Sequence, residues 1–93
     1  MTPNKTEIND SIFAFPCDFP IKAMGKAADD FDALIVGIVR KYASDLMEGA
    51  VTTRFSQGGR FVSVSVTIRA RNRRQLDDIY RELSAHERVL VAL

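Results

Sequence analysis

The chain has 93 residues, of which 46% are hydrophobic and 27% charged, so it is long enough for one globular domain and too short for two. Its longest uncharged apolar stretch, residues 33–39, falls far short of the roughly 20 residues that a membrane-spanning helix needs, and residues 1–8 lack the apolar core of a secretory signal. A single cysteine, Cys17, excludes an internal disulfide and, with one histidine, a Cys/His zinc site. We therefore expect a cytoplasmic protein without a membrane segment.

The net charge of +1 conceals an uneven distribution. Residues 1–50 contain five basic and eight acidic residues, a net charge of −3, whereas residues 51–93 contain eight arginines and four acidic residues, a net charge of +4. An overall charge this close to zero argues against binding of nucleic acid by bulk electrostatics. A nucleic-acid partner is therefore not expected.

The first half of the chain predicts a tail, a strand and a helix. Residues 1–12 are polar and show no periodicity, so we expect a disordered tail before a single domain over residues 13–93. Residues 19–25 alternate in hydrophobicity, which predicts a short strand with Lys22 and Met24 facing outward. From Phe31 to about Tyr42 the apolar residues recur at helical spacing, with acidic residues at the start and basic residues at the end.

The second half predicts a hairpin, a helix and a last strand. Residues 50–55 alternate weakly, residues 56–59 form a glycine-containing turn, and residues 61–69 alternate strictly, which together predict an antiparallel hairpin. Asn72 and Gln75 have the spacing of a capping box and predict an amphipathic helix to about Ala85. Residues 89–93 are uniformly apolar and predict the last strand.

The expected element order is β-α-β-β-α-β. Two right-handed crossovers around a hairpin predict an α+β, ferredoxin-like sandwich, in which a four-stranded antiparallel sheet carries both helices on one face. The other face of the sheet is left open and presents Ser63, Ser65 and Thr67. These outward positions lack the aromatic side chains on which RNA-recognition motifs stack bases, which again disfavours RNA binding.

No pattern in the sequence predicts an enzyme, a metal site or a cofactor. His86 falls at the end of the second helix, where a surface or helix-dipole role is favoured over catalysis. Cys17 lies in an extended segment with no adjacent basic residue that would activate its thiol. Gly58 and Gly59 separate two strands, so a hairpin turn is favoured over a phosphate-binding loop.

Four arginines gather around the start of the second helix: Arg69, Arg71, Arg73 and Arg74. Cations at a helix N-terminus oppose the helix dipole, and this end of a helix binds anions, so the cluster predicts a site for an anionic ligand or an acidic partner surface. The alternative is a solvated face on which Asp77 and Asp78 neutralise Arg73 and Arg74. A second surface is the apolar last strand, which at a sheet edge could pair with a second copy as a weak homodimer, unless other segments cover it.

A set of residues from Phe15 to the C-terminus resembles the YbeD-like bacterial family of unknown function. The residues that carry this resemblance are Phe15-Pro16, Phe19, Met24-Gly25, Ser56, Gly58, Ser63-Val64-Ser65-Val66-Thr67-Ile68, Gln75, Ile79-Tyr80, Leu83 and Leu93. The resemblance implies a cytosolic protein with a ferredoxin-like fold, similar to the ACT-type regulatory domains that bind small ligands, often amino acids. In those domains a glycine after the first strand lets the ligand approach the backbone, and Gly25 has the corresponding place. Some family members are described as lipoate regulators.

The resulting hypothesis is a non-enzymatic regulatory or binding module that senses a small anionic or amino-acid-like ligand. Its expected contacts are Gly25 and the arginines Arg69, Arg71, Arg73 and Arg74. The alternative is a protein–protein adaptor that uses the open face of the sheet or the last strand and needs no small ligand.

Overall fold

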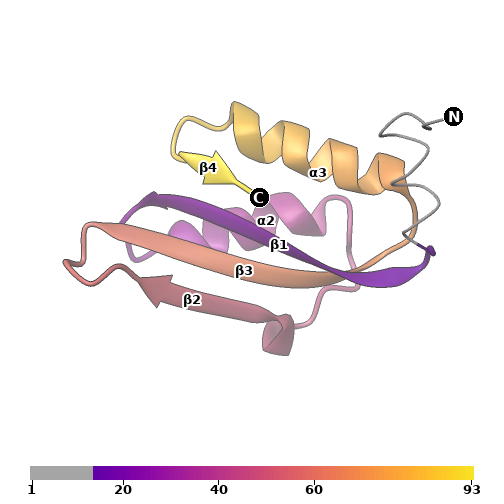
Figure 1. Ribbon diagram of the computed structural model, residues 1–93, viewed down its shortest axis with the longest axis horizontal. Coiled ribbons are helices and arrows are strands. Elements are labelled where there is room, and N and C mark those ends of the chain that lie inside the picture. Colours follow the sequence, from indigo (N-terminus) through magenta and orange to yellow (C-terminus); the bar gives the residue numbers. More distant parts are fainter. Residues whose placement is uncertain (1–13) are drawn as a thin grey trace, which may run out of the picture.

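The computed structural model describes residues 14–93, and the tail expected over residues 1–12 lies outside the described residues. The elements follow in the order β1 (Cys17–Lys26), α2 (Phe31–Arg40), the 3-10 helix η1 (Glu48–Ala50), β2 (Val51–Phe55), β3 (Phe61–Ala70), α3 (Arg73–Ala85) and β4 (Val91–Ala92). The four strands form one sheet in the order β2-β3-β1-β4, and every neighbouring pair is antiparallel (Figure 1). The predicted ferredoxin-like arrangement is confirmed.

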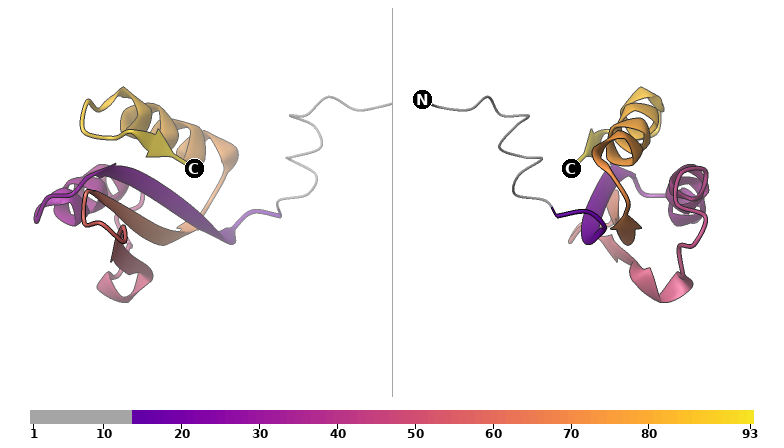
Figure 2. Two further views of the ribbon diagram at one scale, coloured as in Figure 1. Left: turned by 60° about the vertical axis from the view of Figure 1, so that its left-hand side comes forward. Right: turned by 90° about the vertical axis from the view of Figure 1, so that its right-hand side faces the viewer.

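Both helices lie on the same side of the sheet (Figure 2). The core between these layers consists of alternate residues of β1 and β3 and the apolar faces of the helices. Its members include Ile21, Ala23, Val62, Val64, Val66, Ile68, Phe31, Ile35, Ile38, Val39, Leu76, Ile79 and Leu83, all buried. Because strand side chains alternate between faces, the intervening residues of β1, β2 and β3 point away from the helices. Within residues 14–93 no helix covers this second face of the sheet.

The hairpin between β2 and β3 fixes the register of the edge strand β2. Gly59 has a φ of +73°, a backbone conformation that glycine adopts without strain, and its N–H donates to the Ser56 carbonyl at 2.9 Å. The Ser56 hydroxyl accepts from the Phe61 N–H at 3.1 Å. This turn places Thr52 opposite Ser65 and Arg54 opposite Ser63.

Two elements are shorter than the sequence predicts. Helix α2 ends at Arg40, and the Tyr42 carbonyl instead accepts hydrogen bonds from the side chains of Gln75 and Arg71, at 2.7 and 3.0 Å. Strand β4 contains two residues, because Val89 is buried in the core before the chain reaches the sheet. The backbone groups of Leu93 and Lys22 still exchange hydrogen bonds at 2.8 and 2.9 Å, so the β4 segment pairs with β1 up to the last residue.

The start of α3 is capped as predicted, with one difference. The Asn72 side chain accepts from the Gln75 N–H at 2.9 Å. The Gln75 side chain reaches back to the N–H of Arg71 at 2.7 Å, one residue before the amide that a capping box uses. None of the helices within residues 14–93 has the length and apolar character needed to cross a bilayer.

Candidate binding surface

Gly25 lies inside β1 on the helix side of the sheet, opposite Val62. A Cβ atom at this position would meet the Phe31 ring at 2.5 Å from Cε1, and also the backbone carbonyl oxygen of Arg88. Real Cβ atoms do not approach other atoms this closely, so the position requires glycine for the packing of α2 and of the α3–β4 connection onto β1. The space that a side chain would take at Gly25 is therefore filled by the protein's own atoms.

Three of the four clustered arginines contact groups of the chain itself. Arg69 forms an ion pair with Asp18 at 3.4 Å across β1 and β3, and Arg71 donates from its guanidinium to the Tyr42 carbonyl. The Nε of Arg73 lies 3.8 Å from a carboxylate oxygen of Asp77, as the solvated-face alternative expects.

Arg74 does not fit that alternative. Asp78, the carboxylate expected beside it, instead forms an ion pair with Arg81 at 3.4 Å. Arg74 is exposed on the first turn of α3.

The fold separates Gly25 from the arginine cluster. Asp18 and Arg69 pair near one end of β1, whereas Gly25 and Val62 pair near the other end. Seven residues of strand at about 3.3 Å each place these two ends roughly 23 Å apart. One small molecule therefore cannot contact Gly25 and the arginine cluster together.

The remaining residues singled out from sequence lie apart from each other. The His86 ring follows α3, and its Nδ1 accepts from the Arg88 N–H at 3.1 Å. Cys17 is half-buried at the start of β1. Within residues 14–93 no three His, Cys, Asp or Glu side chains are grouped as metal ligands.

The open face of the sheet brings together polar groups from three strands. On this face Lys22 and Thr52 lie on opposite sides of Ser65, and Met24 and Arg54 lie on opposite sides of Ser63. These rows form a depression of about 310 Å³, lined by Lys22, Thr52, Arg54, Ser63 and Ser65. Two cations thus flank a group of hydroxyls.

Strand β4 adds apolar side chains to the same face. Val91 is opposite Met24 and Leu93 is opposite Lys22, so both side chains point away from the helices. Val91 and Leu93 are 42% and 67% exposed, and Phe61 on β3 is 43% exposed.

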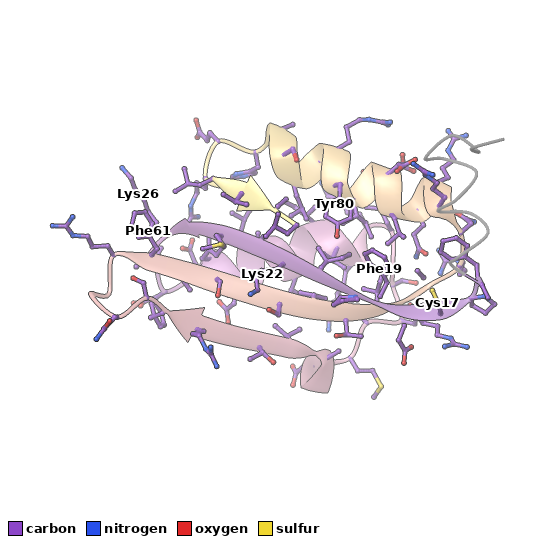
Figure 3. All side chains as sticks on the ribbon, viewed as in Figure 1. Cys17, Phe19, Lys22, Lys26, Phe61 and Tyr80 are labelled. Carbon is purple, nitrogen blue, oxygen red and sulfur yellow. The ribbon has the colours of Figure 1, made fainter. Side chains whose placement is uncertain are left out.

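Figure 3 shows Phe61 beside Lys26 at one end of the sheet and Lys22 near the middle of β1. We call this surface the open-face patch; it consists of Lys22, Met24, Lys26, Arg54, Phe61, Val91 and Leu93.

The charge of the open-face patch is positive. The four strands contain four basic residues and one acidic residue, Asp18, and that residue pairs with Arg69. In the part of the chain that the structure describes, no carboxylate lies within ion-pair distance of Lys22, Lys26 or Arg54. Apart from Asp18, the acidic residues of the described chain lie on and around the helices, together with nearly as many basic residues, so the excess of positive charge lies on the strands.

The sequence pattern places Lys22, Met24, Ser63, Ser65 and Thr67 on the outward face, and the adaptor hypothesis uses this face or the last strand without naming contact residues. Arg54 and the β4 residues were not singled out for this face. The outward position of Arg54 could be predicted, because the periodicity of β3 and the length of the turn together set the register of the hairpin. The orientation of β4 depends on pairing with β1 across the whole chain, which no local pattern shows.

The fold and this surface define a small α+β domain of the ferredoxin-like class, in which the described helices cover one face of the sheet. The solution structure of protein HP0495 from H. pylori has the same fold, with a TM-score of 0.66, 15% sequence identity, and coverage of 87% of this chain and 85% of that chain. The chain belongs to the family described as "Protein of unknown function (DUF493)", which matches residues 10–93. This confirms the YbeD-like resemblance.

Curated relatives match the chain over nearly its whole length. A "UPF0250 protein" of Paraburkholderia phytofirmans is 48% identical over 88 residues, which cover 95% of this chain and 99% of the relative. A UPF0250 protein of Neisseria meningitidis serogroup A is 39% identical over 93 residues, which cover all of both chains. These proteins are similar to the chain in sequence and length, and their names assign no activity.

Proposed function

We propose that the chain is a non-enzymatic protein-binding module whose contact surface is the open-face patch. The observation that carries this proposal is a combination on one sheet face that no helix of residues 14–93 covers: exposed apolar residues lie beside cations to which the described residues offer no carboxylate partner. Protein interfaces commonly have an apolar centre and a polar, charged rim. Val91, Met24 and Phe61 supply the apolar part, and Lys22, Lys26 and Arg54 supply the charge.

The shape of the surface favours a macromolecular partner over a small molecule. Small-molecule sites are concave and enclose most of their ligand. The depression at Ser63 and Ser65, about 310 Å³, is at the small end of the range for such sites, and its neighbour beside Phe61 is only about 90 Å³. A surface with depressions this small gains affinity by covering a large area rather than by enclosing a ligand.

Photo-crosslinking in bacterial cells tests the proposal. A photoreactive p-benzoylphenylalanine replaces Ser65 on the open face, and in a matched variant it replaces Arg74, which is exposed on α3. We expect a discrete crosslinked partner protein from position 65 and a much lower yield of that partner from position 74. Equal yields of the same species from both positions, or no crosslinked species from position 65, would contradict the proposal.

A second candidate function is the sensing of a small anionic or amino-acid-like ligand. The observation in its favour is a groove of about 420 Å³ near Gly25, lined by Lys26, Ala27, Ala28, Glu87, Arg88 and Leu90. In this groove Arg88 already binds the Asp30 carboxylate through two hydrogen bonds, at 2.7 and 3.2 Å, so a ligand anion would have to compete with Asp30. A titration of the isotope-labelled protein with amino acids, lipoate and simple anions decides this: saturable amide shifts at residues 25–28 and 87–90 support it, and no shift with any of them contradicts it.

A further inference from the structure

We infer that the open-face patch binds an extended, acidic segment of a partner protein, in which two carboxylates flank an apolar side chain with the spacing acid-x-apolar-x-acid. This inference rests on the proposed function and names the chemistry of the partner. It is carried by the order of side chains along β1, where Lys22, Met24 and Lys26 share the open face.

The spacing of the cations sets the spacing of the carboxylates. Lys22 and Lys26 are four residues apart on one strand, which corresponds to roughly 13 Å at about 3.3 Å per residue. In an extended partner, residues i and i+4 have the same separation and point to the same side, with residue i+2 between them. Packed strands run nearly parallel to each other, so the three partner side chains can lie over Lys22, Met24 and Lys26 in order.

The neighbouring strands extend the same pattern. Val91 lies beside Met24 on the β4 side and widens the apolar centre. Arg54 lies on β2, beyond Ser63, and adds a third cation for which residues 14–93 supply no carboxylate partner. The partner is therefore expected to have its apolar residue over Met24 and Val91 and to carry additional acidic residues on the side that faces β2.

A second copy of the chain does not fit this surface. Two open-face patches packed against each other would place cations against cations, because Asp18 is the only acidic residue in the strands and is already paired. Like charges facing each other across an interface cost free energy and select against that partner. Nucleic acid supplies negative charge, but its backbone offers nothing apolar to Met24 and Val91, and Phe61 is the one aromatic residue on the open face of the described strands.

The test is an NMR titration of the isotope-labelled full chain with a blocked peptide whose core is Glu-Ser-Leu-Ser-Glu. A control peptide has the same composition in the order Glu-Glu-Ser-Leu-Ser, in which adjacent carboxylates of an extended chain point to opposite sides. We expect saturable amide shifts at residues 22–26 and 91–93 with the first peptide, and binding of the control weaker by about threefold or more. Equal binding of both peptides, shifts confined to the helices, or tighter binding of an oligothymidylate of similar charge would overturn the inference.

Charge variants complete the test. The double variant Lys22→Gln, Lys26→Gln is expected to weaken binding of the first peptide by about tenfold. The control double variant Arg74→Gln, Arg81→Gln removes the same charge from α3, and it should change the affinity for that peptide by less than about twofold. An equal effect of both pairs would mean that net charge alone controls binding, and would overturn the inference. If the peptide fails to bind while position 65 crosslinks a partner in cells, the acidic-segment inference is wrong and the protein-binding function stands; failure of the crosslink removes the function itself.

Discussion

The ring of Phe31 occupies the space in which a side chain at Gly25 would lie. Phe31 is the first residue of α2 and is fully buried, and Gly25 lies near the end of β1. The absence of a Cβ at Gly25 lets the first turn of α2 pack directly on the sheet. This contact gives the glycine a structural role that needs no ligand.

We therefore predict that Gly25→Ala destabilises the protein. The new methyl group would collide with the Phe31 ring and with a backbone carbonyl that cannot move freely, and overpacking of this kind costs about 1–3 kcal/mol. Gly37→Ala is the matched control, because Gly37 is exposed inside α2 and a Cβ there meets nothing within 4 Å. That variant should be more stable by about 0.5–1 kcal/mol. Urea unfolding measures both changes; equal effects of the two substitutions would contradict the packing role of Gly25.

A second prediction concerns Gln75, the only polar residue among the buried ones of the described chain. Its side chain accepts from the Arg71 N–H and donates to the Tyr42 carbonyl, which ties the segment after α2 to the start of α3. Gln75→Met keeps the volume and removes both hydrogen bonds, so we expect a loss of about 1–3 kcal/mol in the free energy of unfolding. The same substitution at the exposed turn residue Gln57 should change it by less than about 0.5 kcal/mol. A loss at position 75 no larger than that at position 57 would show that these bonds contribute nothing net.

A third prediction follows from Glu82, which joins α3 to the residues just after α2. One carboxylate oxygen accepts from Lys41 at 2.5 Å and the other accepts from the Tyr42 hydroxyl at 2.7 Å. The hydrogen bond to Glu82 holds the phenolic proton and raises the pKa of Tyr42 above its ordinary value. The chain has two tyrosines, so the substitution Tyr80→Phe leaves Tyr42 as the one that is observed. In this background, Glu82→Gln should lower the pKa of Tyr42 measured from tyrosinate absorbance. An unchanged alkaline titration would mean that the Tyr42–Glu82 hydrogen bond is not formed in solution.

A fourth prediction concerns the pKa of Asp30, which links this carboxyl to stability in acid. The guanidinium of Arg88 donates two hydrogen bonds to Asp30 and, with its charge, lowers the pKa of that carboxyl below its ordinary value. A group whose pKa is lower in the folded state stabilises the fold above its unfolded-state pKa, and this contribution disappears as the pH falls through the folded-state pKa. Arg88→Gln should therefore bring the pKa of Asp30 back toward its ordinary value, as followed by carboxyl carbon chemical shifts. If the titration of Asp30 is the same in both proteins, the pair is not formed.

Most of the fold could be predicted from local sequence patterns. Nine residues of strict alternation define β3, and the apolar spacing from Phe31 onward defines the buried face of α2. The apolar pattern carries α2 to Tyr42 and begins the last strand at Val89, two residues too far in each case, because distant groups decide these two boundaries. The Tyr42 carbonyl is bonded by side chains about 30 positions later, and Val89 enters the core instead of the sheet.

The candidate surface could be predicted only in part. Alternation alone places Lys22 and Met24 outward, but Arg54 and Val91 join them through strand pairings that connect distant parts of the chain. The closeness of four arginines in the sequence instead suggests the arginine cluster as a binding site. In the structure Arg69 pairs with Asp18, and Arg71 donates to the Tyr42 carbonyl. Neighbours in sequence indicate local charge density, whereas the register of the sheet determines which charges face one another.

The most direct test of the open-face patch is the crosslinking yield from position 65 in a chain that also carries Lys22→Glu and Lys26→Glu. Both side chains are exposed on the open face of β1, so the fold should be retained, as circular dichroism can verify. We predict that charge reversal reduces the yield of the crosslinked partner by about tenfold or more, while Arg74→Glu with Arg81→Glu leaves it within about twofold. An undiminished yield from the folded Lys22→Glu, Lys26→Glu protein would contradict the binding role of this surface.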